Sequence, residues 1–107
     1  MLPHAPTLDQ LAVFLAIVEE GSFAAAARKL GRATSVVSYA IANLEAQLGL
    51  ALFDRTGTRT PRLSEAGRAV LNDARTVGLA VDGLIAKARG LQAGLEAEVA
   101  LVVDVMV

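Results

Sequence analysis

Residues 33–45 read ATSVVSYAIANLE, and the spacing of their apolar side chains predicts an amphipathic helix. One apolar stripe repeats every three or four residues and continues beyond this stretch: Val37, Ile41, Leu44 and Leu48. A stripe with this period ordinarily faces a protein core. The pattern therefore predicts a helix over residues 34–48 that packs against other elements of a domain.

The opposite stripe of this helix is nearly uncharged. It carries small hydroxyls, one alanine and one aromatic ring: Ser35, Ser38, Tyr39 and Ala42. A solvated helix face is normally rich in charged and polar side chains. The small residues on this outer face suggest a surface that a partner must approach closely.

A first helix is predicted from about Leu8 to Glu20. Thr7 is a good N-cap, and Gln10 three residues later completes a capping box. Gly21 is expected to end this helix in the left-handed conformation.

Two further helices follow with very short connections. Ser22 is expected to cap the alanine-rich stretch FAAAARKL (residues 23–30), which Gly31 ends. Thr34 is expected to cap the third helix, and Gly49 to end it. The second and third helices then form a helix–turn–helix pair.

After the third helix the pattern changes to a predicted hairpin. Residues 50–55 (LALFDR) and 59–63 (RTPRL) flank a TGT turn, and Pro61 restricts the second segment to an edge strand. The hairpin would form a wing with three arginines: Arg55, Arg59 and Arg62. The predicted fold is mainly α: a winged helix–turn–helix with a three-helix core, followed by a long dimerisation or linker helix.

The charge distribution is uneven along the chain. The net charge is −1, but residues 28–62 carry six basic and two acidic side chains, a local balance of +4. A basic segment in an acidic chain is compatible with a surface that faces phosphates, and ordinary surface charge is the alternative.

The long helix is predicted from Ser64 and Glu65 to about Gln92. Its apolar residues repeat with heptad spacing: Val70, Ala74, Val77, Val81, Leu84, Ala88 and Leu91. Such a seam is typical of pairing between helices. A helix lying along its own domain is the alternative, but a small domain cannot cover a helix of roughly 40 Å. We therefore expect a homodimer.

The last residues, LEAEVALVVDVMV (95–107), contain an apolar run rich in β-branched side chains, which favours a buried parallel strand from Val99 onward. Such a strand needs neighbours from a further domain. The expected division has four parts: a flexible tail (1–6), a winged helix–turn–helix domain (7–63), a linker helix (64–92), and a hinge with the first strand of a missing domain (93–107).

Composition argues against other function classes. The longest apolar run, residues 11–18, is too short to span a membrane, and the start of the chain does not resemble a secretion signal. There is no cysteine, and the one histidine, His4, lies in the expected tail. We see no pairing of nucleophile and base and no metal-ligand spacing, so we expect no enzyme and no cofactor or metal in this chain, and a cytoplasmic location.

Four motifs together resemble a known family. GSFAAAARKL, VVSYAIANLEAQLG, LFDR and LSEAG stand in the order and spacing of the N-terminal domain of bacterial LysR-type transcriptional regulators. The likeness covers about residues 7–95. It implies sequence-specific binding of double-stranded DNA as a dimer at an interrupted palindrome, with helix 34–48 in the major groove. It also implies a small-molecule effector sensed by a separate domain, and full-length tetramers occur in the family.

The resemblance also implies which residues contact DNA. These are on the third helix and the wing: Thr34, Ser35, Ser38, Tyr39, Arg55, Arg59 and Arg62. The chain departs from the family in two places. Many members carry arginine where Tyr39 stands, and tyrosine cannot make the bidentate guanine contact. The wing is also about one residue longer than the commonest form, so the roles of its arginines are not assigned individually.

Two alternatives remain at this point. One is a protein-interaction module that uses the heptad helix 64–92 to bind a different protein. The other is the winged domain of molybdate-responsive regulators, which shares the fold, although the LFDR and LSEAG motifs favour the LysR type.

Overall fold

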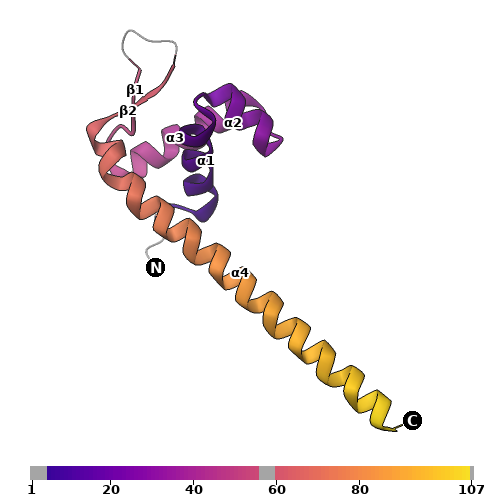
Figure 1. The fold of residues 1–107 in the computed structure, drawn as a ribbon. Helices are drawn as coiled ribbons and strands as arrows, with labels where there is room; N and C mark the ends of the chain where they lie inside the picture. Colours follow the sequence, from indigo (N-terminus) through magenta and orange to yellow (C-terminus); the bar gives the residue numbers. More distant parts are fainter. Residues whose placement is uncertain (1–4, 56–59, 107) are drawn as a thin grey trace.

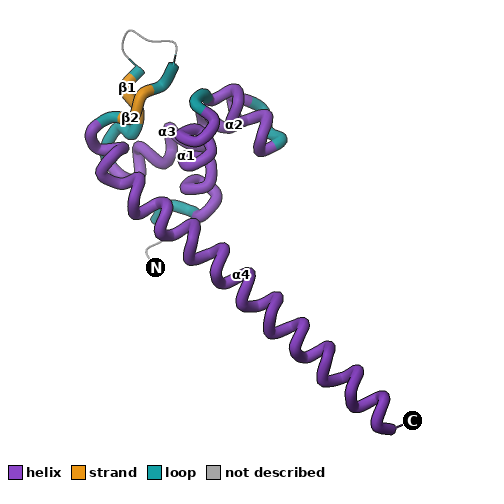
Figure 2. Tube along the Cα trace, viewed as in Figure 1, coloured by secondary structure: helices purple, strands orange, loops and turns teal. Residues whose placement is uncertain are grey.

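The computed structural model describes residues 5–55 and 60–106, and side chains as far as residue 98. The chain forms a compact head from which one long helix extends (Figure 1, Figure 2). The elements in chain order are α1 (Leu8–Glu20), α2 (Phe23–Leu30), α3 (Thr34–Leu48), β1 (Phe53–Asp54), β2 (Arg62–Leu63) and α4 (Glu65–Met106). The predicted winged helix–turn–helix with a long terminal helix is confirmed.

Most of the predicted helix ends are confirmed in atomic detail. Thr7 and Gln10 form the capping box of α1, with Thr7 N–H donating to Gln10 Oε1 at 2.8 Å. The hydroxyl of Ser22 accepts from the N–H of Ala25 at 3.0 Å and caps α2. Helices α1, α2 and α3 each end at a glycine with positive φ, as expected for left-handed caps.

The prediction that Thr34 caps α3 is wrong. Ala33 is the N-cap of α3 and has no side chain that could accept a hydrogen bond. Thr34 is already the first helical residue, so its hydroxyl is one position too late for the N-cap role. Helix α3 therefore begins without the side-chain cap that α1 and α2 possess.

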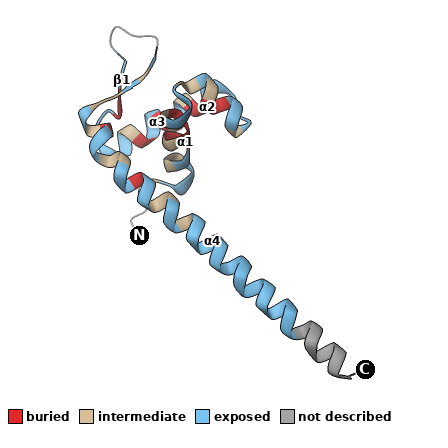
Figure 3. Ribbon diagram, in the orientation of Figure 1, coloured by how far each residue is buried: buried red, intermediate tan, exposed pale blue. Residues whose placement is uncertain are grey.

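The core lies where the three short helices meet the base of the hairpin (Figure 3). Val37, Ile41 and Leu44 of α3 are fully buried, which confirms the predicted inner stripe. Leu48, expected in the core, is 37% exposed because the helix ends there beyond the packed layer. Phe14 and Phe53 are also buried, and Phe23 and Leu30 pack on the core while partly exposed.

Phe53 anchors the hairpin to this core. Its ring lies edge-on to Phe14 and to Phe23, with both pairs of ring centroids 5.6 Å apart. Strands β1 and β2 are antiparallel and short, with Phe53 opposite Leu63 and Asp54 opposite Arg62. The wing base is thereby fixed relative to α1 and α2.

Helix α4 starts in close contact with the segment before β1. Ser64 Oγ accepts from the N–H of Gly67 at 2.9 Å and donates to the carbonyl of Ala51 at 2.6 Å. Gly67 is buried, and a Cβ atom there would overlap the carbonyl oxygen of Leu52. A glycine is therefore required for α4 to leave the wing at this angle.

The strand expected from Val99 is wrong, and so is the helix end near Gln92. Helix α4 continues to Met106, and the molecule extends 72 Å along its longest axis. A parallel strand needs a neighbour for its backbone hydrogen bonds, and β1 and β2, the strands of the described residues, pair with each other. A helix satisfies these groups within itself, and β preference depends strongly on context.

The predicted heptad seam divides into two parts along α4. Its first residues lie against the head: Ala74 is buried, and Val70, Val77 and Val81 are half-buried. Every residue from Asp82 to Glu98 is exposed, including Leu84 and Leu91 (Figure 3). The alternative of a helix lying along its own domain thus holds for the first part only.

No single helix within the described residues is long and apolar enough to cross a membrane. Helices α1 and α2 meet this condition only together, across a bend of 120°.

Candidate nucleic-acid interface

The outer face of α3 is exposed and carries no charge. The exposed residues along the helix are Thr34, Ser35, Val36, Tyr39, Ala42, Asn43, Ala46, Gln47 and Leu48. The one charged residue of α3, Glu45, is half-buried and faces the wing. The face can therefore approach a polyanion without electrostatic repulsion from its own carboxylates.

The predicted contact residues of α3 differ in how far they project. Tyr39 is 70% exposed and stands out from the helix, whereas Ser38 is half-buried. Thr34 and Ser35 are exposed in the first turn, where free backbone N–H groups favour an anion. Val36 is also exposed, at 51%, and sequence reasoning missed it because its apolar side chain suggested packing.

Arg55 lies at the other end of α3 from Thr34 and Ser35. Its guanidinium stacks over the Phe23 ring, 5.2 Å from the centroid, and its Nη2 is 3.5 Å from Glu45 Oε1. Its side chain is still 54% exposed. The structure therefore holds Arg55 in place while leaving part of its guanidinium open to a phosphate.

The other two wing arginines are less defined. Arg62 is exposed on β2, opposite Asp54 and hence beside the strand that leads to Arg55. Arg59 lies outside the described residues. Arg62 thus lies on β2 and Arg55 directly follows β1, so both belong to one wing, as the sequence predicts.

Glu45 connects α3 to the wing, which sequence reasoning did not foresee. Its Oε2 accepts from the backbone N–H of Leu52 at 2.7 Å, and its Oε1 faces Arg55. One carboxylate thus fixes both the path of the chain into β1 and the wing arginine. The only sequence signal was that Glu45 is the single acid on an otherwise uncharged helix.

A second unforeseen contact joins α1 to the turn before α3. Arg32 donates to both oxygens of Asp9, with Nη1–Oδ2 at 2.8 Å and Nη2–Oδ1 at 2.7 Å. This hydrogen bonding lowers the pKa of the Asp9 carboxyl and raises the pKa of the Arg32 guanidinium. Both groups are therefore charged at neutral pH, and the pair is a bidentate ion pair.

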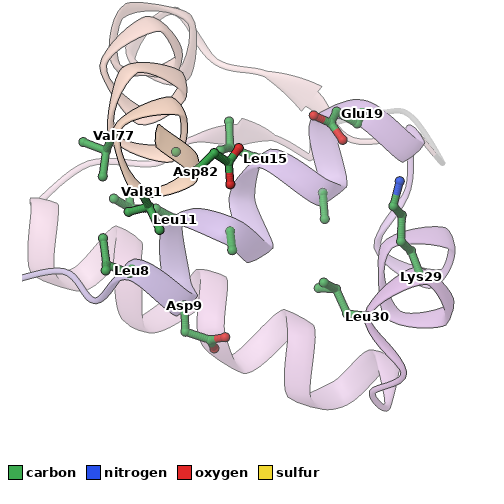
Figure 4. A pocket seen from close by; sticks show the side chains of 13 residues that line it. Leu8, Asp9, Leu11, Leu15, Glu19, Lys29, Leu30, Val77, Val81 and Asp82 are labelled. Carbon is green, nitrogen blue, oxygen red and sulfur yellow. The ribbon is translucent and has the colours of Figure 1, made fainter. Parts of the chain in front are cut away.

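An apolar groove of about 510 Å³ lies between α1, α2 and α4. Figure 4 shows Leu8, Leu11 and Leu15 of α1 with Val77 and Val81 of α4 in its lining. A Cβ atom at Gly78 would lie 3.4 Å from Leu15 Cδ1, an ordinary van der Waals distance, so α1 and α4 are in contact at this point. The groove is thus continuous with the predicted dimerisation seam.

Among the described residues, no cluster of three or more His, Asp and Glu side chains is arranged to hold a metal ion.

Comparison with known families decides the classification. Residues 8–68 match the model of the bacterial regulatory helix-turn-helix proteins of the lysR family. The chain belongs to the lysR family. This match spans α1 to the first turn of α4 and so contains both α3 and the wing.

Curated relatives of this lysR-family chain include regulators from several bacteria. It is 42% identical over 104 residues to a probable HTH-type transcriptional regulator, YhaJ, of Escherichia coli, covering 97% of this chain and 35% of the relative. It is 41% identical over 95 residues to the HTH-type transcriptional regulator AceR of Acinetobacter baumannii, covering 89% of this chain and 32% of the relative. The chain thus spans about a third of the length of these relatives.

Solved structures of lysR-family proteins have the same fold. The complex of the BenM DNA-binding domain with catB site 1 DNA matches with a TM-score of 0.75 and 34% identity, covering 79% of this chain and 94% of that one. The oxidized form of Corynebacterium glutamicum OxyR matches with a TM-score of 0.75 and 33% identity, covering 81% of this chain and 28% of that one. The resemblance stated from the sequence is therefore confirmed.

Proposed function

We propose that this chain is the DNA-binding part of a transcriptional regulator and reads double-stranded DNA with α3. The observation that carries the proposal is the uncharged outer face of α3, which projects Tyr39 and Val36 beside a basic wing. A major groove admits a helix whose side chains reach base edges. The BenM domain, which shares this fold, is solved in complex with DNA.

Within this proposal the residues have different roles. Tyr39 and Val36 are placed to contact base edges, for example the methyl group of thymine, and Ser38 to donate or accept a hydrogen bond. Thr34 and Ser35 would bind a phosphate through their backbone N–H groups. Arg55 and Arg62, and Arg59 beside them in sequence, would bind the backbone along the wing and position the helix without reading sequence.

We further propose that two copies pair through the seam of α4, with the exposed part of the seam and the groove beside α1 covered in the dimer. Leu84 and Leu91 are 68% and 65% exposed in the single chain. A two-fold dimer would present two copies of α3 about 34 Å apart, or a multiple of it, and so read an interrupted palindrome. The division into a DNA-binding domain (7–63) and a linker helix that begins at residue 64 belongs to the same proposal.

The dimer is tested by mass measurement of the intact chain and of a Leu84→Lys, Leu91→Lys variant. We expect the variant to have half the mass of the wild type, because charge at the seam prevents helix pairing. Leu79→Lys is the matched control, since Leu79 is 70% exposed but lies off the seam. A homodimeric mass also argues against a module that pairs only with a different protein, and a wild-type monomer would contradict the dimer.

DNA contact is tested by titrating a random-sequence duplex across a range of salt. We expect Arg55→Ala to weaken binding to all sequences alike and to reduce the slope of log affinity against log salt by about 1. A Ser38→Ala, Arg55→Ala double variant should bind more weakly still. Arg89→Ala is the control, because Arg89 is exposed on the distal part of α4. Unchanged affinity in the double variant would contradict this site.

A further inference from the structure

The turn before α3 is built differently from the starts of the other helices. The hydroxyl groups of Thr7, Ser22 and Ser64 each accept a backbone N–H in the first turn of α1, α2 and α4. Helix α3 has Ala33 at this position and no side-chain cap. Its first turn therefore needs another means of being held in place.

Arg32, the residue before Ala33, is fixed at both its backbone and its side chain. Its N–H donates to the carbonyl of Ala27 at 2.9 Å, which ties it to the end of α2. Both terminal nitrogens of its guanidinium donate hydrogen bonds to the Asp9 carboxylate, at 2.7 and 2.8 Å. Arg32 thus connects the end of α2 and the start of α3 to the first turn of α1.

Asp9 is itself held in a rigid position. It is the second residue of α1, inside the turn that the capping box of Thr7 and Gln10 closes. A carboxylate near a helix N-terminus is also stabilised by the helix dipole. The bidentate geometry allows only one orientation of the guanidinium, so the position of Asp9 is transmitted to Arg32.

We propose that the Asp9–Arg32 ion pair is a positioning device for α3, replacing the missing cap and setting where its first turn lies against DNA. The proposal rests on the proposed function, because the positioned residues, Thr34 and Ser35, are those assigned to a phosphate. Arg32 and Asp9 act through α3 and do not themselves touch DNA.

The geometry favours this role over direct phosphate binding by Arg32. Both terminal nitrogens of Arg32 already bind the carboxylate, and both oxygens of Asp9 bind Arg32. Transfer of Arg32 to a phosphate would leave the Asp9 charge without its partner beside a polyanion. The unpaired charge would be repelled by the DNA it faces.

The test compares Asp9→Asn, Arg32→Gln and the exchanged pair Asp9→Arg, Arg32→Asp in duplex binding at fixed salt. We expect each single variant to lose about fivefold in affinity, as a bidentate pair of this exposure allows. The exchanged pair should regain most of the affinity that the single variants lose. When the titration is repeated across a range of salt, the slope of log affinity against log salt should be unchanged in Arg32→Gln, because no phosphate contact is removed. Asp73→Asn and Arg89→Gln are matched controls for the loss of one exposed charge.

A second readout separates positioning from general stability. The N–H groups of Val36 and Val37 donate to the carbonyl of Ala33 at the start of α3. Amide hydrogen exchange of these two residues should accelerate in both single variants, while the melting temperature stays within a few degrees of the wild type. A merely structural ion pair would change the melting temperature and not affinity, and this result would overturn the proposal.

Two other outcomes would also overturn it. Tighter binding by Asp9→Asn, with a slope reduced by about 1 in Arg32→Gln, would identify Arg32 as a phosphate ligand restrained by Asp9. Wild-type affinity in both single variants would show that the pair has no role in binding. If the wild-type chain itself binds no duplex, the proposed function fails first, so the two failures are distinguishable.

Discussion

Apolar side chains of the same types are buried in the head of the molecule and exposed on the distal part of α4. In the head, apolar side chains such as Ile41 and Leu44 are fully buried, and the Phe53 ring packs against α1 and α2. In α4 beyond Val81, leucines of similar size are exposed. The head is therefore complete by itself, whereas the distal helix has an apolar surface that only another chain or segment can cover.

The largest expected effect contrasts these two regions directly. Ile41→Ala should lower the free energy of unfolding by about 2–5 kcal/mol, because it leaves a cavity in the buried layer. Leu79→Ala, at a residue 70% exposed on α4, should change it by less than about 0.5 kcal/mol. Urea denaturation followed by circular dichroism measures both. Equal losses would show that α4 is as much part of the core as α3.

The next effect contrasts two glycines in α4. Gly67→Ala should destabilise the head by about 3 kcal/mol, because the new Cβ atom overlaps the Leu52 carbonyl. Gly83→Ala meets no atom within 4 Å and should stabilise the helix by up to about 1 kcal/mol. Thermal melting of the two variants should therefore shift in opposite directions. A shift in the same direction would contradict the close contact at Gly67.

A smaller effect is expected at the link between α3 and the wing. Glu45→Ala removes the acceptor for the Leu52 N–H and should cost about 2 kcal/mol in urea denaturation. Glu96→Ala is the control, because Glu96 is exposed on the distal helix. Amide exchange at Leu52 should accelerate in Glu45→Ala alone. Protection that remains unchanged would mean that the wing base does not depend on this carboxylate.

The smallest effect concerns acid stability. The pKa of Asp9 is lower in the folded chain than its usual value of 3.8. Its contribution to stability is therefore complete above this value and is lost as the pH falls through the lower folded pKa. The difference in urea midpoint between wild type and Asp9→Asn should be constant near neutral pH and should vanish once the pH has fallen below the lowered folded pKa of Asp9. A difference that persists at that pH would contradict the assignment.

Local sequence signals predicted most of the fold. The capping box of α1, the Ser22 cap of α2 and the terminal glycines are local signals, so they predict the bounds of α1 and α2 and the end of α3. The N-cap of α3 is the exception, because Ala33 and not Thr34 occupies it. The apolar stripe of α3 and the arginines of the wing are likewise predicted from signals within a short stretch of sequence. The identity of the third helix as the exposed, uncharged element followed from the same pattern.

What the sequence did not predict depends on contacts between distant residues. Asp9 and Arg32 are 23 residues apart, and nothing in the local pattern joins them. The role of Gly67 depends on the carbonyl of Leu52 and so appears only in three dimensions. The β-branched residues of the run from Val99 predict a strand, although such preferences yield to the hydrogen bonds that the surroundings allow.

The central claim is that α3 reads the sequence of double-stranded DNA. The most direct measurement is selection of binding sites by this 107-residue chain from a random duplex pool, at low and at near-physiological salt. We predict enrichment of an interrupted two-fold site whose half-sites lie about 10 bp or a multiple of it apart. Binding at low salt without any enriched motif would contradict the claim, because it would leave only a charge-driven contact with the backbone.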